Sequence, residues 1–156
     1  MTRTVNLTYS KTTLAWTDFE VVDDDEDIGD GEAEAGATYG FDWSSTGANI
    51  TVNISLQHVA RVKRSANKTA ALLRHEQGHL DLGVLVVRRL KRDIEQGSDP
   101  NNANASHRAR LTAINRTYDT NTDHSQNTAN QNAWNTELDA ALIAPTPPAS
   151  VRGSLL

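Results

Sequence analysis

Apolar and polar residues alternate in several N-terminal stretches, and this pattern predicts β-strands. Residues 4–9 alternate, and the segment from Ile50 to Leu56 places Ile50, Val52, Ile54 and Leu56 on one face. Leu14 to Phe19 and Ala37 to Trp43 are predicted to be extended as well, with a turn over residues 44–49. Together these segments predict a small, mostly antiparallel sheet at the N-terminal end of the chain.

Helical periodicity replaces this alternation in the second half of the chain. The segment from Ser65 to Glu95 is predicted to be one long helix, because its apolar residues recur at helical spacing: Leu72, Leu73, Leu80, Val84, Val87, Leu90 and Ile94. A Gly and a following Pro within residues 96–102 end it. Two further helices are predicted from about Ser106 to Tyr118 and from about Asn127 to Ile143. The predicted fold class is therefore α+β, with a single domain over residues 1–144 and a disordered tail over residues 145–156.

The long helix contains the pattern His-Glu-x-x-His at His75, Glu76 and His79. Positions i and i+4 share one face of a helix, so both imidazoles can bind one metal ion. Glu76 follows the first His directly, which suits a general base in metal-assisted hydrolysis. The alternative is a solvated or core-packed His pair on an ordinary amphipathic helix. The pattern on this helix predicts a zincin-like fold.

A catalytic zinc ion usually takes three protein ligands and keeps one position for water, so a third ligand is needed. Leu82 and Leu85 stand where a metzincin has Gly and His. Glu95 lies about 24 Å along the helix axis from His79, which excludes it. Asp81 points away from the metal face and is expected to pair with a neighbour such as Arg88.

Four candidates for the third ligand remain: His107, Asp119, Asp123 and His124. We prefer His124, because it lies in a predicted loop between two helices that can fold back over the first, and because imidazole suits zinc best. His107 stays open as an alternative ligand or as an oxyanion donor. His58 is interpreted as a surface or packing residue.

Two motifs resemble a known family. The residues His75-Glu-Gln-Gly-His-Leu-Asp81, together with Tyr118-Asp-Thr-Asn-Thr-Asp-His124 and then Gln131 and Trp134, resemble the bacterial domain-of-unknown-function 922 family, described as predicted zinc-dependent peptidases. Segments 14–19 and 40–44 also look like strands of that family, so the resemblance covers about residues 14–142. It implies one zinc ion bound by His75, His79 and His124, with Glu76 as the base.

The same resemblance offers roles for other residues of the two motifs. It makes Tyr118 a candidate catalytic residue, whose hydroxyl supports the developing oxyanion, and lets Asp119 orient a ligand His through its second ring nitrogen. A packing Tyr and a helix-ending Asp are the alternatives. Gln131 and Trp134 are interpreted as packing of the last helix against the site.

Composition narrows the function and the compartment. Without Cys the chain can form neither a disulfide nor a Cys ligand, which excludes a site like that of peptide deformylase. The net charge of −5 and the lack of a basic stripe argue against a nucleic-acid partner. No window is apolar enough to span a membrane. The first residues lack the apolar core of a signal peptide, so we expect a cytoplasmic protein unless this is a mature or truncated form of a secreted or periplasmic one.

Residues 23–34 form an acidic, Gly-bearing loop, which we interpret as a solvated connection between strands. The alternative is a calcium site, since Asp23, Asp25, Asp27 and Glu34 fall at positions 1, 3, 5 and 12 of an EF-hand-like loop. Ile28 stands where that loop needs Gly, which weakens the calcium alternative.

The sequence therefore predicts a zinc-dependent metallopeptidase acting on a peptide or protein. Zinc-bound water attacks the peptide bond, and Glu76 takes its proton and passes it to the leaving amine. The strand at residues 50–56 is expected to offer its edge to an extended substrate. One alternative is a zinc-stabilised, non-catalytic binding or assembly module with the same His ligands, in which a side chain such as Asp123 fills the fourth position. Another is a metal-dependent hydrolase of a non-peptide amide or ester.

Overall fold

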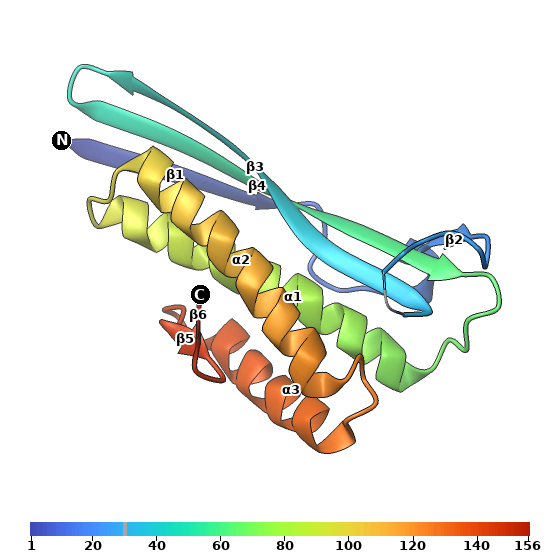
Figure 1. Ribbon diagram of the computed structural model, residues 1–156. Helices are drawn as coiled ribbons and strands as arrows, with labels where there is room; N and C mark the ends of the chain where they lie inside the picture. The colour runs from blue at the N-terminus through green and yellow to red at the C-terminus, as the bar shows by residue number, and fades with distance from the viewer. Residues whose placement is uncertain (30) are drawn as a thin grey trace.

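The computed structural model describes residues 1–29 and 31–156 (Figure 1). Within them the strands come first: β1 (Thr2–Tyr9), β2 (Glu20–Val22), β3 (Ala33–Thr46) and β4 (Asn49–Lys63), with a 3-10 turn η1 (Trp16–Asp18) after β1. The helices follow: α1 (Ala70–Glu95), α2 (Pro100–Thr122) and α3 (Thr128–Ile143). A short hairpin of β5 (Ser150–Val151) and β6 (Ser154–Leu155) ends the chain. The predicted α+β class, with strands before helices, is confirmed.

The prediction of a mostly antiparallel sheet is wrong. Strand β4 is central: β1 and β2 pair with its two halves in parallel, and β3 pairs antiparallel along its length. Two of the three pairings described for this sheet are thus parallel. Alternation predicts that a strand exists but carries no information on its direction. Only β3 and β4 are joined by a tight turn, whereas β1 reaches its partner across a long connection.

The two faces of the sheet follow the period of two expected for strands. Val52, Ile54 and Leu56 of β4 are fully or almost fully buried on the inner face, where Val5 of β1 lies opposite Val52. The outer face is polar. Asn6 donates a hydrogen bond to Asn53 (2.8 Å), and Asn53 donates to Asp42 (2.9 Å), which links three strands. The core therefore lies on the inner face, against α1.

Helix α1 runs between the sheet and the other two helices (Figure 1). Its buried residues include the continuous run from Gly78 to Val87, as expected for a helix covered on two sides. It begins at Ala70 rather than at the predicted Ser65, because the side chain of Thr69 caps it by accepting from the N–H of Leu72 (3.1 Å). No helix among the described residues has the length and apolarity to cross a bilayer, in line with the prediction.

Helix α2 extends beyond both predicted ends, Ser106 and Tyr118. It begins at Pro100 because Asp99 caps it, accepting from the N–H of Asn102 (2.9 Å). It continues to Thr122, so Asp119 lies within the helix. The added turns are polar and lack the apolar periodicity on which the prediction rested. This longer helix brings Asp119 over α1.

Structure departs from prediction in two further segments. Residues 14–19, predicted to be extended, contain the 3-10 turn η1, and the carboxylate of Asp18 accepts from the N–H of Ala15 (2.7 Å). Residues 145–156, predicted to be disordered, include the β5–β6 hairpin, because Val151 and Leu156 are buried. Arg110 of α2 also donates to the carbonyl of Leu156 (2.8 Å). The tail therefore packs on the helices.

Candidate functional site

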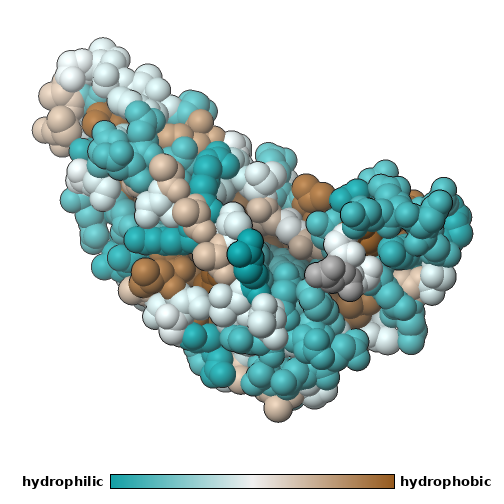
Figure 2. Space-filling view, viewed as in Figure 1, coloured by the Kyte–Doolittle hydropathy of each residue, from teal (hydrophilic) through white to brown (hydrophobic). Residues whose placement is uncertain are grey.

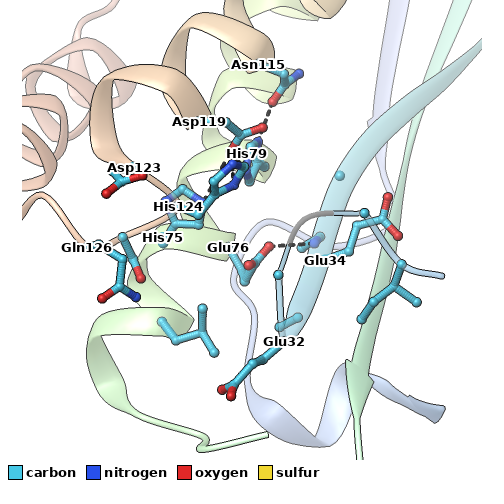
Figure 3. Close-up of a pocket in the computed structure, with 18 of the residues that line it drawn as sticks. Glu32, Glu34, His75, Glu76, His79, Asn115, Asp119, Asp123, His124 and Gln126 are labelled. Atoms are coloured by element: carbon cyan, nitrogen blue, oxygen red, sulfur yellow. Dashed lines mark hydrogen bonds and ion pairs between the residues drawn. The ribbon is translucent and has the colours of Figure 1, made fainter. Parts of the chain in front are cut away.

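A cavity of about 810 Å³ opens where the N-terminal part of α1, the end of α2 and the start of β3 meet (Figure 3). His75, Glu76 and His79 of α1 line it from one side. Asp119 and the turn after α2 close a second side, and residues 33–37 of β3 form a third. The predicted motif thus faces a hollow large enough for a segment of a substrate.

Three His side chains converge on one carboxylate oxygen. The Oδ1 atom of Asp119 lies 3.3 Å from Nε2 of His75 and 2.9 Å from Nε2 of His79. Nδ1 of His124 lies 3.8 Å from the same oxygen. Ligand atoms of His75, Asp119 and His124 all lie within 4.8 Å of one another, which is compatible with one metal ion. His79 is not part of this group, although its Nε2 atom also contacts Asp119, so the structure brings together His75, Asp119 and His124 and places the predicted ligand His79 beside them.

Side-chain amides orient both motif imidazoles. Nδ1 of His75 lies 3.0 Å from Oε1 of Gln131, and Nδ1 of His79 lies 2.6 Å from Oδ1 of Asn115. Each amide is fixed by its NH₂ group: Gln131 donates to the Tyr118 hydroxyl (2.7 Å) and Asn115 to a backbone carbonyl (2.8 Å). Each Nδ1 must therefore donate its proton, and the neutral ring keeps its lone pair on Nε2. The predicted orienting role of Asp119 thus falls to Gln131 and Asn115.

This arrangement fits a bound cation. A protonated ring can donate from Nε2 to Asp119, whereas two neutral rings would place their Nε2 lone pairs against a carboxylate oxygen and repel it unless a cation lies among them. Burial alone would lower the pKa of His79, but its hydrogen bond to Asp119 and the charge of Asp119 raise it overall. Burial acts to raise the pKa of Asp119, but hydrogen bonds from His75 and His79 hold it well below its usual range. Imidazole and carboxylate are ordinary zinc ligands, so the donor set fits zinc.

Glu76 lies beside this cluster, in the wall of the same cavity (Figure 3). Its side chain is almost fully buried, and its Oε2 atom accepts a hydrogen bond from the N–H of Ala35 on β3 (2.5 Å). Burial raises the pKa of Glu76 to about 7. A group with a pKa near neutral can both take and return a proton. The location therefore agrees with the predicted role of general base.

Tyr118 is placed differently from its predicted catalytic role. It is fully buried, and its ring stacks on His75 with centroids 4.8 Å apart. Its hydroxyl donates to the carbonyl of His75 (3.1 Å) and accepts from Gln131. Tyr118 is not among the described residues that line the cavity. The structure thus favours the packing alternative, with Tyr118 holding α2 and α3 against the motif.

An unusual turn aims His124 at the cluster. Asp123, His124 and Ser125 have φ angles of 48°, 48° and 77°. Left-handed backbone costs an ordinary residue about 1 kcal/mol or more, so three in succession indicate that the surroundings enforce it. The turn reverses the chain after α2, with the N–H of His124 on the carbonyl of Asp119 (3.2 Å). It gives His124 the position predicted for the third ligand.

The remaining ligand candidates have other surroundings. Nε2 of His107 lies 2.9 Å from the carboxylate of Asp93, which is about 21 Å beyond His79 along α1. The structure therefore does not bring His107 to the site. Asp123 caps α2 and lines the cavity. Asp81 pairs with Arg74 (2.9 Å) rather than with the neighbour named in the prediction.

The acidic loop braces the connection between β4 and α1. Asp23 pairs with Arg64 (3.1 Å), Glu34 pairs with Arg61 (2.9 Å), and Asp24 accepts from the N–H of Ser65 (2.8 Å). Two of the four proposed calcium ligands are therefore bound to guanidinium groups. The structure favours the interpretation as a solvated loop.

Sequence reasoning missed or misassigned four contributors to the site. Asp119 was considered as a ligand and then given an orienting role, and Gln131 was interpreted as packing. Asn115 was not considered, although it lies one turn before Asp119 on the same helix face. His75 and His79 have the same spacing of four residues, so the sequence could have indicated that Asn115 and Asp119 share a helix face. The sequence cannot identify the N–H of Ala35 as part of the site, because every non-proline residue has a backbone N–H.

Comparison with known proteins yields no relative. A scan of protein-family models, a search of curated proteins and a search of solved structures each found no match. The resemblance to the domain-of-unknown-function 922 family therefore stays a prediction. The geometry itself defines an α+β protein with a partly buried His and Asp cluster that could hold a metal ion.

Proposed function

We propose that this protein is a zincin-like, zinc-dependent peptidase whose metal ion is held by His75, His79 and His124. One observation carries the proposal: the three imidazoles converge in a cavity that Glu76 also lines. A His cluster that served only to hold the fold would need no buried carboxylate facing the same hollow.

The residues divide the chemistry among them. When bound, zinc would supply a Lewis acid that polarises the scissile carbonyl and acidifies water. Glu76 takes a proton from the attacking water and delivers it to the leaving amine. The N–H of Ala35 holds one carboxylate oxygen of Glu76 against β3, which keeps the base in place. Gln131 and Asn115 keep the two motif imidazoles in the tautomer with Nε2 free for the metal.

The edge of β3 supports a peptide as the substrate. Strand β4 is paired on both sides, so the edge expected at residues 50–56 is not free. The far part of the β3 edge is covered by α2, since Arg108 donates to the carbonyl of Tyr39 (2.8 Å) and Trp43 donates to Asn101 (3.0 Å). Residues 33–37 instead line the cavity. The N–H of Ala35 on this edge is bound to Glu76, so an extended peptide would add beside Glu76 through the remaining backbone groups of residues 33–37, whereas a small ester would not need this edge.

Metal analysis and a peptide cleavage assay test the proposal. We expect the purified protein to bind one zinc ion per chain and to cleave a mixture of peptides. Cleavage should stop when a chelator is added and resume when zinc is added back. His124→Ala should weaken zinc binding by at least the roughly 10- to 100-fold typical of losing an outer-shell residue.

His107→Ala is the matched control for this experiment. It removes a buried imidazole that contacts Asp93 rather than the cluster, so zinc content should not change. Cleavage that continues at an equal rate in fully chelated protein would show that the proposed function is wrong.

Asp119 favours a second candidate function, the zinc-stabilised binding or assembly module. Its Oδ1 atom contacts both motif imidazoles, so it can act as a fourth protein ligand. Four protein ligands would close the coordination sphere and leave no position for water. The sequence pointed to Asp123 for this role, but the structure puts Asp119 closest to the His cluster.

Asp119→Asn separates the two functions. If the three imidazoles are the ligands, we expect the variant to keep its zinc, with an affinity within about tenfold of the parent, because Gln131 and Asn115 still orient both rings. Competition with a chromogenic chelator measures this affinity. Asp123→Asn is the control, since Asn tolerates the left-handed backbone at that position. Loss of zinc and of thermal stability in Asp119→Asn alone would favour the module.

A further inference from the structure

The cavity wall is rich in carboxylates. Glu32, Glu34, Glu76, Asp119 and Asp123 all line it, and the described lining residues include no Lys or Arg. Most of these charges are already compensated or engaged. Glu34 pairs with Arg61, Asp119 contacts the imidazoles, and Glu76 accepts from a backbone N–H. A bound zinc ion would offset the charges of Asp119 and Glu76, so the remaining negative charge of the wall is that of Glu32 and Asp123.

Glu32 carries much of that remaining charge. Among the described residues it has no ion pair, and one of its oxygens accepts from the N–H of Asn67 (3.2 Å), which holds the carboxylate at the wall. Glu32 directly precedes the open edge at residues 33–37. Figure 3 shows it on the β3 side of the cavity, below Glu76, with Gln126 on the opposite side. Its carboxylate is therefore close to the path of a peptide on that edge.

Apolar side chains share the lining of the cavity with Glu32. Ile28 and Leu72 line the same cavity, and Leu72 is only partly buried. Lys and Arg side chains combine an apolar stem with a charged tip, so they match a cavity lined by both aliphatic side chains and carboxylates. An acidic side chain would meet repulsion from Glu32 and Asp123 there.

We infer that the cavity selects peptides with a Lys or Arg close to the scissile bond, and that Glu32 pairs with this side chain. The inference rests on the proposed peptidase function and names its substrate class. The carboxylates of Glu32 and Asp123 raise the local concentration of cationic peptides, and the pair with Glu32 sets the preferred position.

Peptides that differ at one position test the inference. A series carries Lys, Gln or Glu at each position flanking the cleavage site, and kcat/KM is measured with zinc-loaded wild-type protein at low and high salt. We expect Lys to exceed Glu by about tenfold at the best position at low salt, with a smaller ratio at high salt, as for a partly exposed ion pair. Glu32→Gln should lower the ratio about threefold, and Glu32→Lys should bring it to about one or below. Glu20→Gln removes an equal charge outside the cavity lining and should leave the ratio unchanged.

The outcomes separate this inference from the proposed function. Cleavage without a preference for Lys, or with a preference for Glu, overturns the inference and leaves the peptidase standing. A preference that Glu32→Lys does not change overturns the role of Glu32. Failure of the zinc-loaded protein to cleave any peptide of the series or of the mixture overturns both.

Discussion

Replacing Glu76 by Gln should lower kcat for peptide cleavage by about 10²- to 10⁴-fold, the range typical of a lost general base, while the zinc content stays at that of the parent. Gln has the same shape, and its carbonyl oxygen can still accept from the N–H of Ala35, so the buried site should not rearrange. What it cannot do is take a proton at neutral pH. Peptide cleavage rates and elemental analysis of the same preparation measure both quantities.

Glu95→Gln is the matched control for this substitution. Glu95 lies on the same helix, is 42 % exposed and pairs with Lys91, so its neutralisation should change neither cleavage nor zinc content. A Glu76→Gln protein that cleaves as fast as the parent would remove Glu76 from the mechanism. A variant that loses zinc as well would show that Glu76 supports the metal centre.

The centre of the site could be predicted from sequence because its chemistry is local. His75 and His79 are four residues apart on one helix, and the helix is specified by its own apolar periodicity. Glu76 follows from the same spacing. Asn115 and Asp119 repeat this spacing on α2, but the predicted helix ended at Tyr118, so the two residues were not recognised as a pair on one helix face. An error of one turn at a polar helix end therefore separated Asp119, a ligand candidate, from Asn115.

Long-range features of the site could not be predicted from sequence, because they depend on how elements pack. Alternating residues look the same in parallel and antiparallel strands, so the prediction gave the edge that borders the cavity to residues 50–56, whereas in the structure it belongs to β3. The left-handed turn at Asp123, His124 and Ser125 contains no Gly to signal it. The hairpin at the end of the chain depends on two buried residues, Val151 and Leu156, within a Pro- and Ser-rich tail.

The polar surface also contains interactions that could not be predicted from the sequence. Teal, hydrophilic residues cover much of the face seen in Figure 2, and brown residues occur in small separate groups. The acidic loop contributes to this polar surface and still positions the site, since its carboxylates bind Arg61, Arg64 and a backbone N–H on the chain leading to α1. The acidic loop, which the sequence predicted to be only solvated, therefore also contacts the segment that leads into α1.

Gly78→Ala should destabilise the protein by about 2 to 4 kcal/mol, although Ala is the better helix former by about 1 kcal/mol. A Cβ atom at this position would lie 2.2 Å from the hydroxyl of Tyr118 and 2.6 Å from its Cζ. Tyr118 has no room to retreat, because its ring stacks on His75 and packs edge-on against Trp134. Moving it would also break the buried hydrogen bonds of its hydroxyl to His75 and Gln131.

Denaturant unfolding of the metal-free protein measures this loss without interference from zinc binding. Gly36→Ala is the control, since a Cβ there would have nothing within 4 Å, and its free energy of unfolding should be unchanged or up to about 1 kcal/mol above that of the parent, because Ala loses less backbone entropy than Gly. Because Tyr118 and Gln131 both touch His75, Gly78→Ala should weaken zinc binding as well, whereas a clash remote from the site would lower stability alone. Equal stability of Gly78→Ala and the parent would mean that α2 does not lie this close to the motif, and the contacts that orient His75 would then need another origin.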